Sequence, residues 1–87
     1  MTGSYSLATK KSAERELRSI PKDTLRRIVE RIHRLAQDPR PPGCEKLSGE
    51  ERYRVRQGDY RIVYSVNDAS RTVEVVKVGH RREVYRS

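Results

Sequence analysis

The residues Asp38–Cys44 constrain the fold of this chain more than any other segment, because they contain Pro39, Pro41, Pro42 and Gly43. Proline inside a helix removes a backbone hydrogen bond and clashes with the preceding turn, so a helix that reaches this segment ends there. Before the segment the apolar residues recur with a helical period, and after it they alternate with the period of a strand. The sequence therefore predicts an α+β protein with helices in its first half and a sheet in its second half.

Two helices and one short strand are predicted in the first half. The strand covers Ser4–Ala8, and the helix that follows covers Lys10–Ser19 and ends before Pro21. A longer helix covers Asp23–Gln37. Its apolar residues form one stripe, which consists of Leu25, Ile28, Val29, Ile32, Leu35 and Ala36. Polar and charged residues occupy the other faces of this helix, so we expect the stripe to pack on the sheet.

Three further strands are predicted in the second half, over Arg52–Gln57, Tyr60–Val66 and Thr72–Gly79. The last strand has valines on both parities, which predicts a strand that is covered on both sides. The element order is β-α-α-β-β-β, with a small, mostly antiparallel sheet and two helices packed on one of its faces. A chain of 87 residues has room for one hydrophobic core, so residues 1–87 are expected to form a single domain.

A tight turn at Gly58 and Asp59 determines how the first two of these strands pair. A two-residue loop there places Arg56 opposite Arg61, and Arg54 shares their face of the sheet. This face points away from the helices. Like charges directly opposite each other destabilise a sheet, so the pair predicts a site for an anion between the two side chains. The alternative interpretation is a set of solvated arginines on an exposed strand face.

The charge of the chain favours a polyanionic partner. Lys and Arg number 20 against 12 Asp and Glu, which gives a formal net charge of +8 and a pI near 10.2. Nucleic acid is the first candidate partner and an acidic protein the second. The single cysteine, Cys44, fits a reducing compartment, and no apolar segment is long enough to span a bilayer. We therefore expect a cytoplasmic protein without a membrane partner.

The residues after the last strand add groups that could take part in chemistry. An antiparallel third strand is expected to bring His80 or Arg81 close to Arg61, and Tyr85 follows shortly after them. Arginines can stabilise the charge that develops when an RNA 2'-hydroxyl attacks its own phosphate, and His or Tyr can transfer protons. For His80 and Tyr85 a purely structural role remains the alternative. No spacing of ligand residues predicts a metal site, and no motif predicts a cofactor.

Five segments of the chain resemble RelE-type toxins of the RelE/ParE superfamily in order and spacing. They are residues 41–43 (PPG), 46–49 (KLSG), 53–56 (YRVR), 58–64 (GDYRIVY) and 78–81 (VGHR). The resemblance implies a RelE-like fold for the whole chain. It also implies toxicity through cleavage of messenger RNA in the ribosomal A site, and neutralisation by a cognate antitoxin.

The resemblance also implies roles for particular residues. It places the family's site residues at Arg54, Arg56, Arg61, Arg81 and Tyr85. Together with the arginine face and the residues after the last strand, this gives catalytic candidates Arg54, Arg56, Arg61, His80, Arg81 and Tyr85, and RNA-binding candidates Arg52, Arg54, Arg56, Arg61, Arg81 and Arg82. The chain departs from the best-known RelE toxin in having arginine at positions 54 and 56, where that toxin has lysine. Guanidinium binds phosphate well but does not give up its proton near neutral pH. His80 also replaces a lysine, which makes its imidazole a candidate for proton transfer.

These inferences lead to three hypotheses for the function. The first is a metal-independent, ribosome-dependent endoribonuclease, an mRNA interferase that inhibits translation. It would bind the 70S ribosome and form a hetero-oligomer with an acidic, RelB-like antitoxin. The second is a ParE-like inhibitor of DNA gyrase, and the third is a non-catalytic RNA-binding module. The presence of the RelE-like residues favours the first hypothesis.

Overall fold

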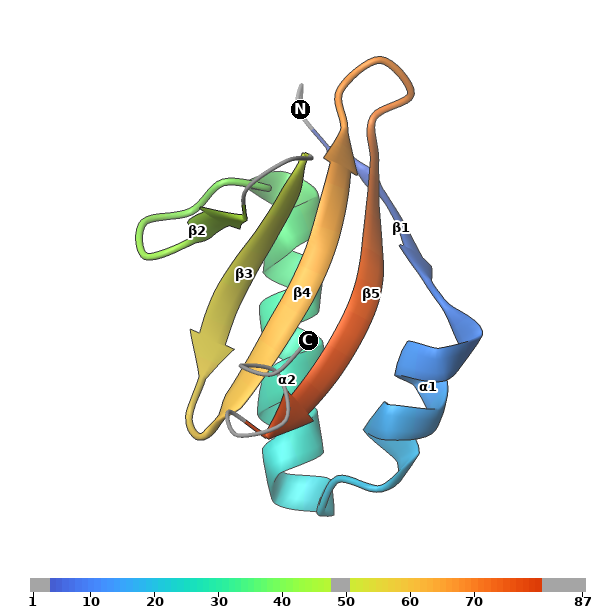
Figure 1. Ribbon diagram of the computed structural model, residues 1–87, viewed down its shortest axis with the longest axis vertical. Coiled ribbons are helices and arrows are strands. Elements are labelled where there is room, and N and C mark those ends of the chain that lie inside the picture. The colour runs from blue at the N-terminus through green and yellow to red at the C-terminus, as the bar shows by residue number, and fades with distance from the viewer. Residues whose placement is uncertain (1–3, 48–50, 81–87) are drawn as a thin grey trace.

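The computed structural model describes residues 4–47 and 51–80. These residues form two helices and five strands (Figure 1). In order they are β1 (Ser6–Thr9), α1 (Lys11–Arg18), α2 (Lys22–Gln37), β2 (Glu45–Leu47), β3 (Arg52–Gln57), β4 (Tyr60–Asn67) and β5 (Thr72–His80). The predicted elements are all present, and the α+β class is confirmed. Strand β2 was not predicted, because three residues are too few to show an alternating pattern.

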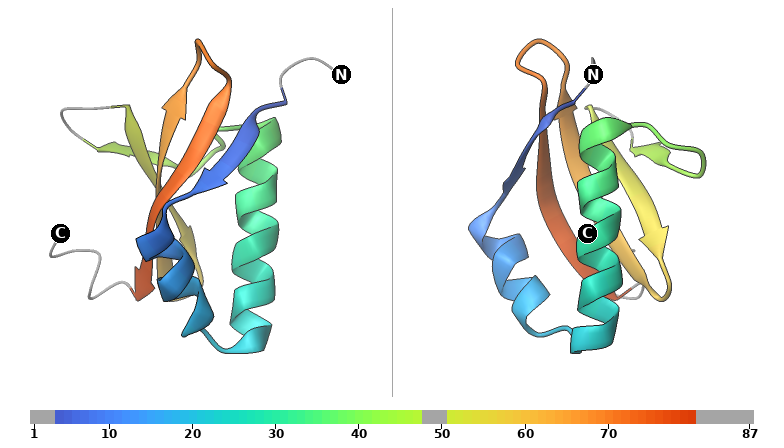
Figure 2. Two further views of the ribbon diagram at one scale, coloured as in Figure 1. Left: turned by 90° about the vertical axis from the view of Figure 1, so that its right-hand side faces the viewer. Right: turned by 180° about the vertical axis from the view of Figure 1, so that it is seen from behind.

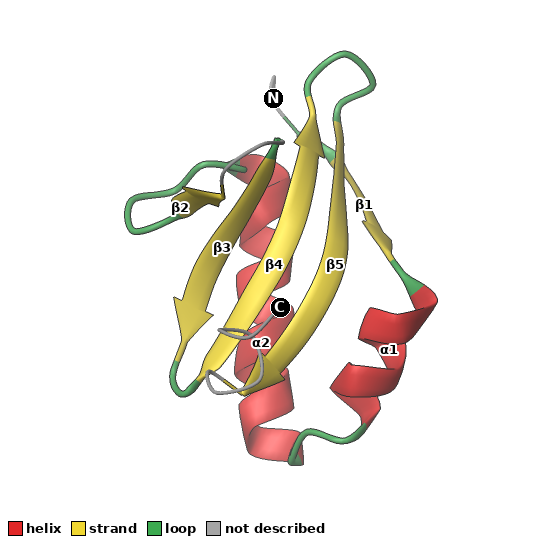
Figure 3. Cartoon of the chain, viewed as in Figure 1, coloured by secondary structure: helices red, strands yellow, loops and turns green. Residues whose placement is uncertain are grey.

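The strands form one sheet in the order β1-β5-β4-β3-β2. Strands β2 to β5 pair with their neighbours in antiparallel fashion, and β1 pairs with β5 in parallel. The prediction of a mostly antiparallel sheet is therefore confirmed. The parallel pair arises because both helices lie between β1 and the rest of the sheet in the sequence, which lets the chain return to the same end of the sheet (Figure 3).

Both helices lie on the same side of the sheet. Figure 2 shows α2 running along one face, with α1 beside the β5 side of the sheet. No helix in the described part of the chain covers the opposite face. None of the described helices is long and apolar enough to cross a membrane.

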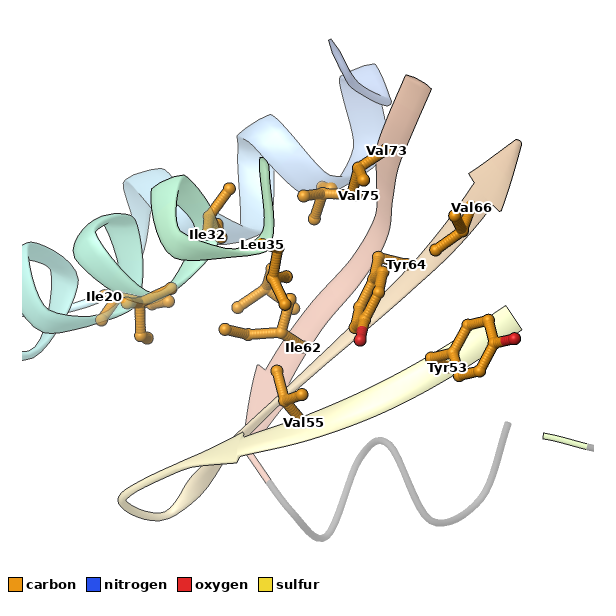
Figure 4. Close-up of a cluster of buried hydrophobic side chains, with 13 residues drawn as sticks. Ile20, Ile32, Leu35, Tyr53, Val55, Ile62, Tyr64, Val66, Val73 and Val75 are labelled. Atoms are coloured by element: carbon orange, nitrogen blue, oxygen red, sulfur yellow. The ribbon is translucent and has the colours of Figure 1, made fainter. Parts of the chain in front are cut away.

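The core lies between α2 and the sheet (Figure 4). From the predicted stripe, Ile28, Ile32 and Leu35 are buried, and they pack against sheet residues such as Ile62 and Tyr64. The buried Tyr64 hydroxyl donates a hydrogen bond of 2.6 Å to the Pro39 carbonyl oxygen. This bond joins the sheet to the proline segment that ends α2.

Strand β5 contains an irregularity that changes the explanation of its valines. Val63 pairs with Lys77, whereas the next residue of β4, Tyr64, pairs with Val75. Val76 is therefore an extra residue in β5, and the side chains before and after it change parity relative to the sheet. As a result Val73, Val75 and Val78 all face the core although they do not alternate in the sequence. The valines on both parities thus result from a bulge, and the earlier interpretation of them was wrong.

Candidate nucleic-acid interface

The pairing of β3 with β4 brings the predicted arginines together. Arg56 is the partner of Arg61, and Arg54 is the partner of Val63, as the turn at Gly58 predicted. Gly58 has a φ of +61°, the left-handed conformation that glycine adopts most easily. Tyr53 and Val55, which alternate with these arginines, are buried in the core. The arginines therefore belong to the sheet face that points away from the helices.

The two members of the arginine pair have different environments. Arg56 is exposed, whereas Arg61 is buried, with 4% of its surface accessible. Arg61 also interacts with other groups of the protein. The picture of three solvated arginines therefore does not apply to Arg61. Arg61 is therefore held in place at the strand position directly opposite Arg56.

Glu45 on β2 is a site residue that the sequence analysis missed. Its Oε1 accepts hydrogen bonds from Nη2 and Nε of Arg54, at 2.6 and 3.1 Å. The hydrogen bond from Arg54 lowers the pKa of the Glu45 carboxyl, and the charges of Arg56 and Arg61 lower it further. Glu45 therefore stays ionised among the arginines. Finding it from sequence would have required the strand β2, which gave no signal.

A cavity of about 340 Å³ lies at the edge of β3. It is lined by Val55, which faces the helices, and by Arg54 and Arg56, which face the other way, so it extends around the edge of the strand. Strand β2 covers this edge only as far as the pair of Glu45 with Arg54. The cavity thus lies beside the part of β3 that has no neighbouring strand.

Arg31 of α2 also lines this cavity, together with Arg61. Nε of Arg31 is buried and has no hydrogen-bond partner among the described residues. A buried donor without a partner costs about 1–3 kcal/mol, and more when the group is charged. Arg31 follows Ile28 by three residues and precedes Leu35 by four, so it borders the apolar stripe. This position at the border of the stripe could have indicated from the sequence that Arg31 is partly buried. The sequence analysis instead assigned Arg31 to the polar faces of the helix.

His80 does not lie where it was expected. It pairs with Tyr60, and its ring makes an edge contact with the Tyr60 ring at a centroid distance of 5.8 Å. Gly79, rather than His80, is the partner of Arg61. Since neighbouring residues of a strand point to opposite faces, His80 points to the helix side of the sheet. The expectation that its side chain joins Arg61 is therefore wrong.

His80 instead lines a second cavity, of about 380 Å³, beside α1. There Glu16 of α1 accepts a hydrogen bond of 2.8 Å from the backbone N–H of Val78 and lies 3.3 Å from Nζ of Lys77. Strand β1 pairs with β5 only as far as Val75, so Glu16 satisfies a backbone donor beyond the end of β1. The role of Glu16 in this cluster is therefore to accept the hydrogen bond of a backbone N–H at the edge of the sheet.

The other predicted residues are partly outside the described region. Arg52 lies at the start of β3 opposite Ser65, on the same face as Arg54. Arg81, Arg82 and Tyr85 lie outside the described residues. The described site thus consists of the arginines of β3 and β4, Glu45 and Arg31.

The fold and this site define a class of protein. A small α+β domain with a net charge of +8 presents four arginines around one cavity, and one of its carboxylates pairs with Arg54. Guanidinium groups bind phosphate and carboxylate through paired, charge-assisted hydrogen bonds. A small basic α+β protein with such a cluster of arginines is chemically suited to bind anionic groups.

Comparison with known sequences identifies the family. The family described as "ParE toxin of type II toxin-antitoxin system, parDE" matches residues 7–85. The chain is also 30% identical over 86 residues to "Toxin RelG" of Mycobacterium tuberculosis, an alignment that covers 94% of this chain and 97% of that protein. The chain belongs to this family of toxins, and it is the toxin of a RelBE/ParE-type toxin-antitoxin system.

Solved structures show the same fold. The RelBE2 toxin-antitoxin complex of Mycobacterium tuberculosis has a chain with a TM-score of 0.80 and 28% identity, covering 90% of this chain and 99% of that one. A chain of the archaeal RelE-RelB complex of Pyrococcus horikoshii OT3 has a TM-score of 0.78 and 31% identity, with coverages of 90% and 96%. These similarities confirm the predicted RelE-like fold.

Proposed function

We propose that this toxin is a metal-independent, ribosome-dependent endoribonuclease that cleaves messenger RNA and thereby inhibits translation. The observation that carries the proposal is the pairing of Arg56 with Arg61 across β3 and β4. Two like charges at directly opposite positions destabilise the sheet when nothing lies between them. A bound phosphate would convert this repulsion into two attractive interactions, which supports a role of the pair in binding.

The proposed reaction needs no group beyond the RNA and the protein. The 2'-oxygen attacks the adjacent phosphorus, and the bond from phosphorus to the 5'-oxygen breaks. A base removes the proton of the 2'-hydroxyl, and an acid supplies a proton to the departing 5'-oxygen. Arg56 and Arg61 would stabilise the additional negative charge on the phosphate oxygens. DNA lacks the attacking hydroxyl, which restricts the reaction to RNA.

The remaining residues have supporting roles in the proposal. Arg54 and Arg81 would help to hold the reacting phosphate, and Arg52 and Arg82 would bind neighbouring parts of the RNA. His80 and Tyr85 are the candidates for proton transfer. Because the His80 ring contacts Tyr60 on the helix side of the sheet, Tyr85 is the better candidate of the two. Replacing the residue that transfers the proton should lower turnover roughly 100-fold.

Two partners belong to the proposal. One is the ribosome with messenger RNA in its A site. The other is an acidic, RelB-like antitoxin, supported by the net charge of +8 and by the RelE-RelB complexes to which this chain is similar. A counter-charged partner would relieve the repulsion within so small a basic protein.

The experiment that tests the proposal compares Arg56→Ala with Arg34→Ala. Both residues are exposed arginines, but Arg34 lies on α2 and away from the arginine face. Messenger RNA is incubated with the purified toxin, with and without ribosomes, and cleavage is mapped by primer extension. Removing one well-placed donor should slow cleavage about 100-fold for Arg56→Ala. Arg34→Ala should cleave at the wild-type rate.

Equal loss of activity in both variants would mean that total charge, and not the arginine pair, carries the activity. A gyrase supercoiling assay is run on the same samples. Inhibition of gyrase without any RNA cleavage would overturn the proposal in favour of the ParE-like alternative.

A further inference from the structure

The cavity at the edge of β3 has an excess of positive charge. Among the described residues, those that line it carry four guanidinium groups, from Arg31, Arg54, Arg56 and Arg61, and one carboxylate, from Glu45. That carboxylate is already bound to Arg54, with 2.6 Å between Oε1 and Nη2. Converging like charges favour the binding of an anion. The cavity therefore has the electrostatic character of an anion site.

Arg31 adds to this cavity a cation that does not belong to the sheet. The other three arginines come from β3 and β4, whereas Arg31 comes from α2 on the other side of the sheet. Arg31 lines the cavity, and its Nε is buried and has no hydrogen-bond partner in the described ranges 4–47 and 51–80. A buried, charged donor requires an acceptor. The chain thus holds a donor in place without an acceptor from its own described residues.

The proposed function makes a phosphate of RNA the acceptor in this cavity. Glu45 already supplies a carboxylate there, and it leaves Nε of Arg31 unsatisfied. The fork of N–H groups in a guanidinium matches two oxygens of a phosphate. A backbone phosphate of RNA can enter along the edge of β3 beyond Arg54, which β2 does not cover.

We propose that Arg31 is a positioning residue that binds a non-scissile phosphate of the RNA in the cavity at the edge of β3. This inference rests on the proposed function for the identity of its ligand. Arg56 and Arg61 line the same cavity and also form the pair across the strands, so they connect this phosphate to the one that is cleaved. Arg31 would hold the RNA backbone and would not stabilise the reacting phosphate.

The first test uses inorganic phosphate and needs no RNA. The arginine Nε–H signals of the ¹⁵N-labelled toxin are followed by NMR during titration with phosphate at constant ionic strength. We expect the Arg31 signal to shift in a saturable manner, while the signal of the exposed Arg34 does not. Acetate at the same concentrations should cause no saturable shift. An Arg31 signal that does not respond to phosphate, or that responds equally to acetate, would overturn the inference.

The second test measures RNA cleavage by Arg31→Gln and, as a matched control on the same helix, Arg34→Gln. For Arg31→Gln we expect KM to rise about tenfold, which equals about 1.4 kcal/mol of binding free energy, with kcat nearly unchanged. Arg31→Lys should recover part of the affinity. A fall in kcat at unchanged KM would place Arg31 at the reacting phosphate and overturn the positioning role.

The two tests separate the inference from the proposed function. If wild-type toxin cleaves RNA but Arg31 does not bind phosphate, the proposed function stands and the inference fails. If phosphate saturates the Arg31 signal but no RNA is cleaved, the anion site stands and the proposed function fails. Thermal melting of Arg31→Gln checks the fold, and we expect no loss of stability because the substitution removes an unsatisfied buried donor.

Discussion

The repulsion between Arg56 and Arg61 can be measured with a double-mutant cycle. The substitutions are Arg56→Gln, Arg61→Gln and both together, since glutamine keeps part of the side-chain stem and removes the charge. Two unit charges about 5 Å apart repel by ~0.8 kcal/mol in water, and guanidinium groups that extend side by side from directly opposite positions can come about this close. Burial of Arg61 reduces the screening by solvent, so we expect an unfavourable coupling of about 1 kcal/mol.

The assay is urea unfolding of the four proteins at low ionic strength and again at about 1 M salt, where the screening length is only about 3 Å. Arg61→Gln alone should destabilise the protein, because Arg61 is buried and its interactions are lost. The cycle removes this contribution from the coupling. The unfavourable coupling free energy should become smaller at high salt, and it should become favourable when phosphate is added. A coupling of zero or a favourable coupling at low salt, without phosphate, would refute the argument that the pair is a binding site.

Three further predictions concern the hydrogen bonds and ion pairs of the fold. Tyr64→Phe should lower the free energy of unfolding by about 1–3 kcal/mol in urea titrations, because the buried Pro39 carbonyl loses its donor; an unchanged value would mean that water replaces the hydroxyl. Glu45→Gln should strengthen RNA binding in fluorescence anisotropy, most strongly at low salt, because Arg54 is released from its ion pair; weaker binding would contradict this. The hydrogen bond from Arg40 lowers the pKa of Asp68, so the stability from this pair is present above the usual value of 3.8 and is lost as the pH falls below it. Thermal melting should therefore depend less on acid pH in Asp68→Asn, and identical pH profiles would refute that link.

The arginine pair could be predicted because hairpin pairing is a local property. A two-residue turn determines which residues face each other, and the alternation of side chains then determines the face. The pairs from Tyr53 with Tyr64 to Gln57 with Tyr60 agree with the prediction without exception. Local periodicity likewise predicted α2 and its buried residues Ile28, Ile32 and Leu35. The other residues of the predicted stripe are only partly buried, namely Leu25, Val29 and Ala36.

The position of His80 was predicted less well. The pairing of β4 with β5 depends on where the bulge at Val76 lies, and the turn before β5 does not determine this. A shift of one residue moves a side chain to the other face of the sheet. His80 was correctly expected near Tyr60, yet its imidazole lies on the helix side of the sheet.

The sequence by itself determined the two helices, the strands other than β2, the hairpin pairing and the arginine face, since each of these depends on residues close together in the chain. Only the tertiary structure decided that Glu45 neutralises Arg54 and that Arg31 reaches the same cavity from α2. Both contacts join segments whose approach depends on how α2 packs on the sheet and where β2 ends. Such packing results from the combined burial of many apolar side chains, and no local pattern of residues encodes it.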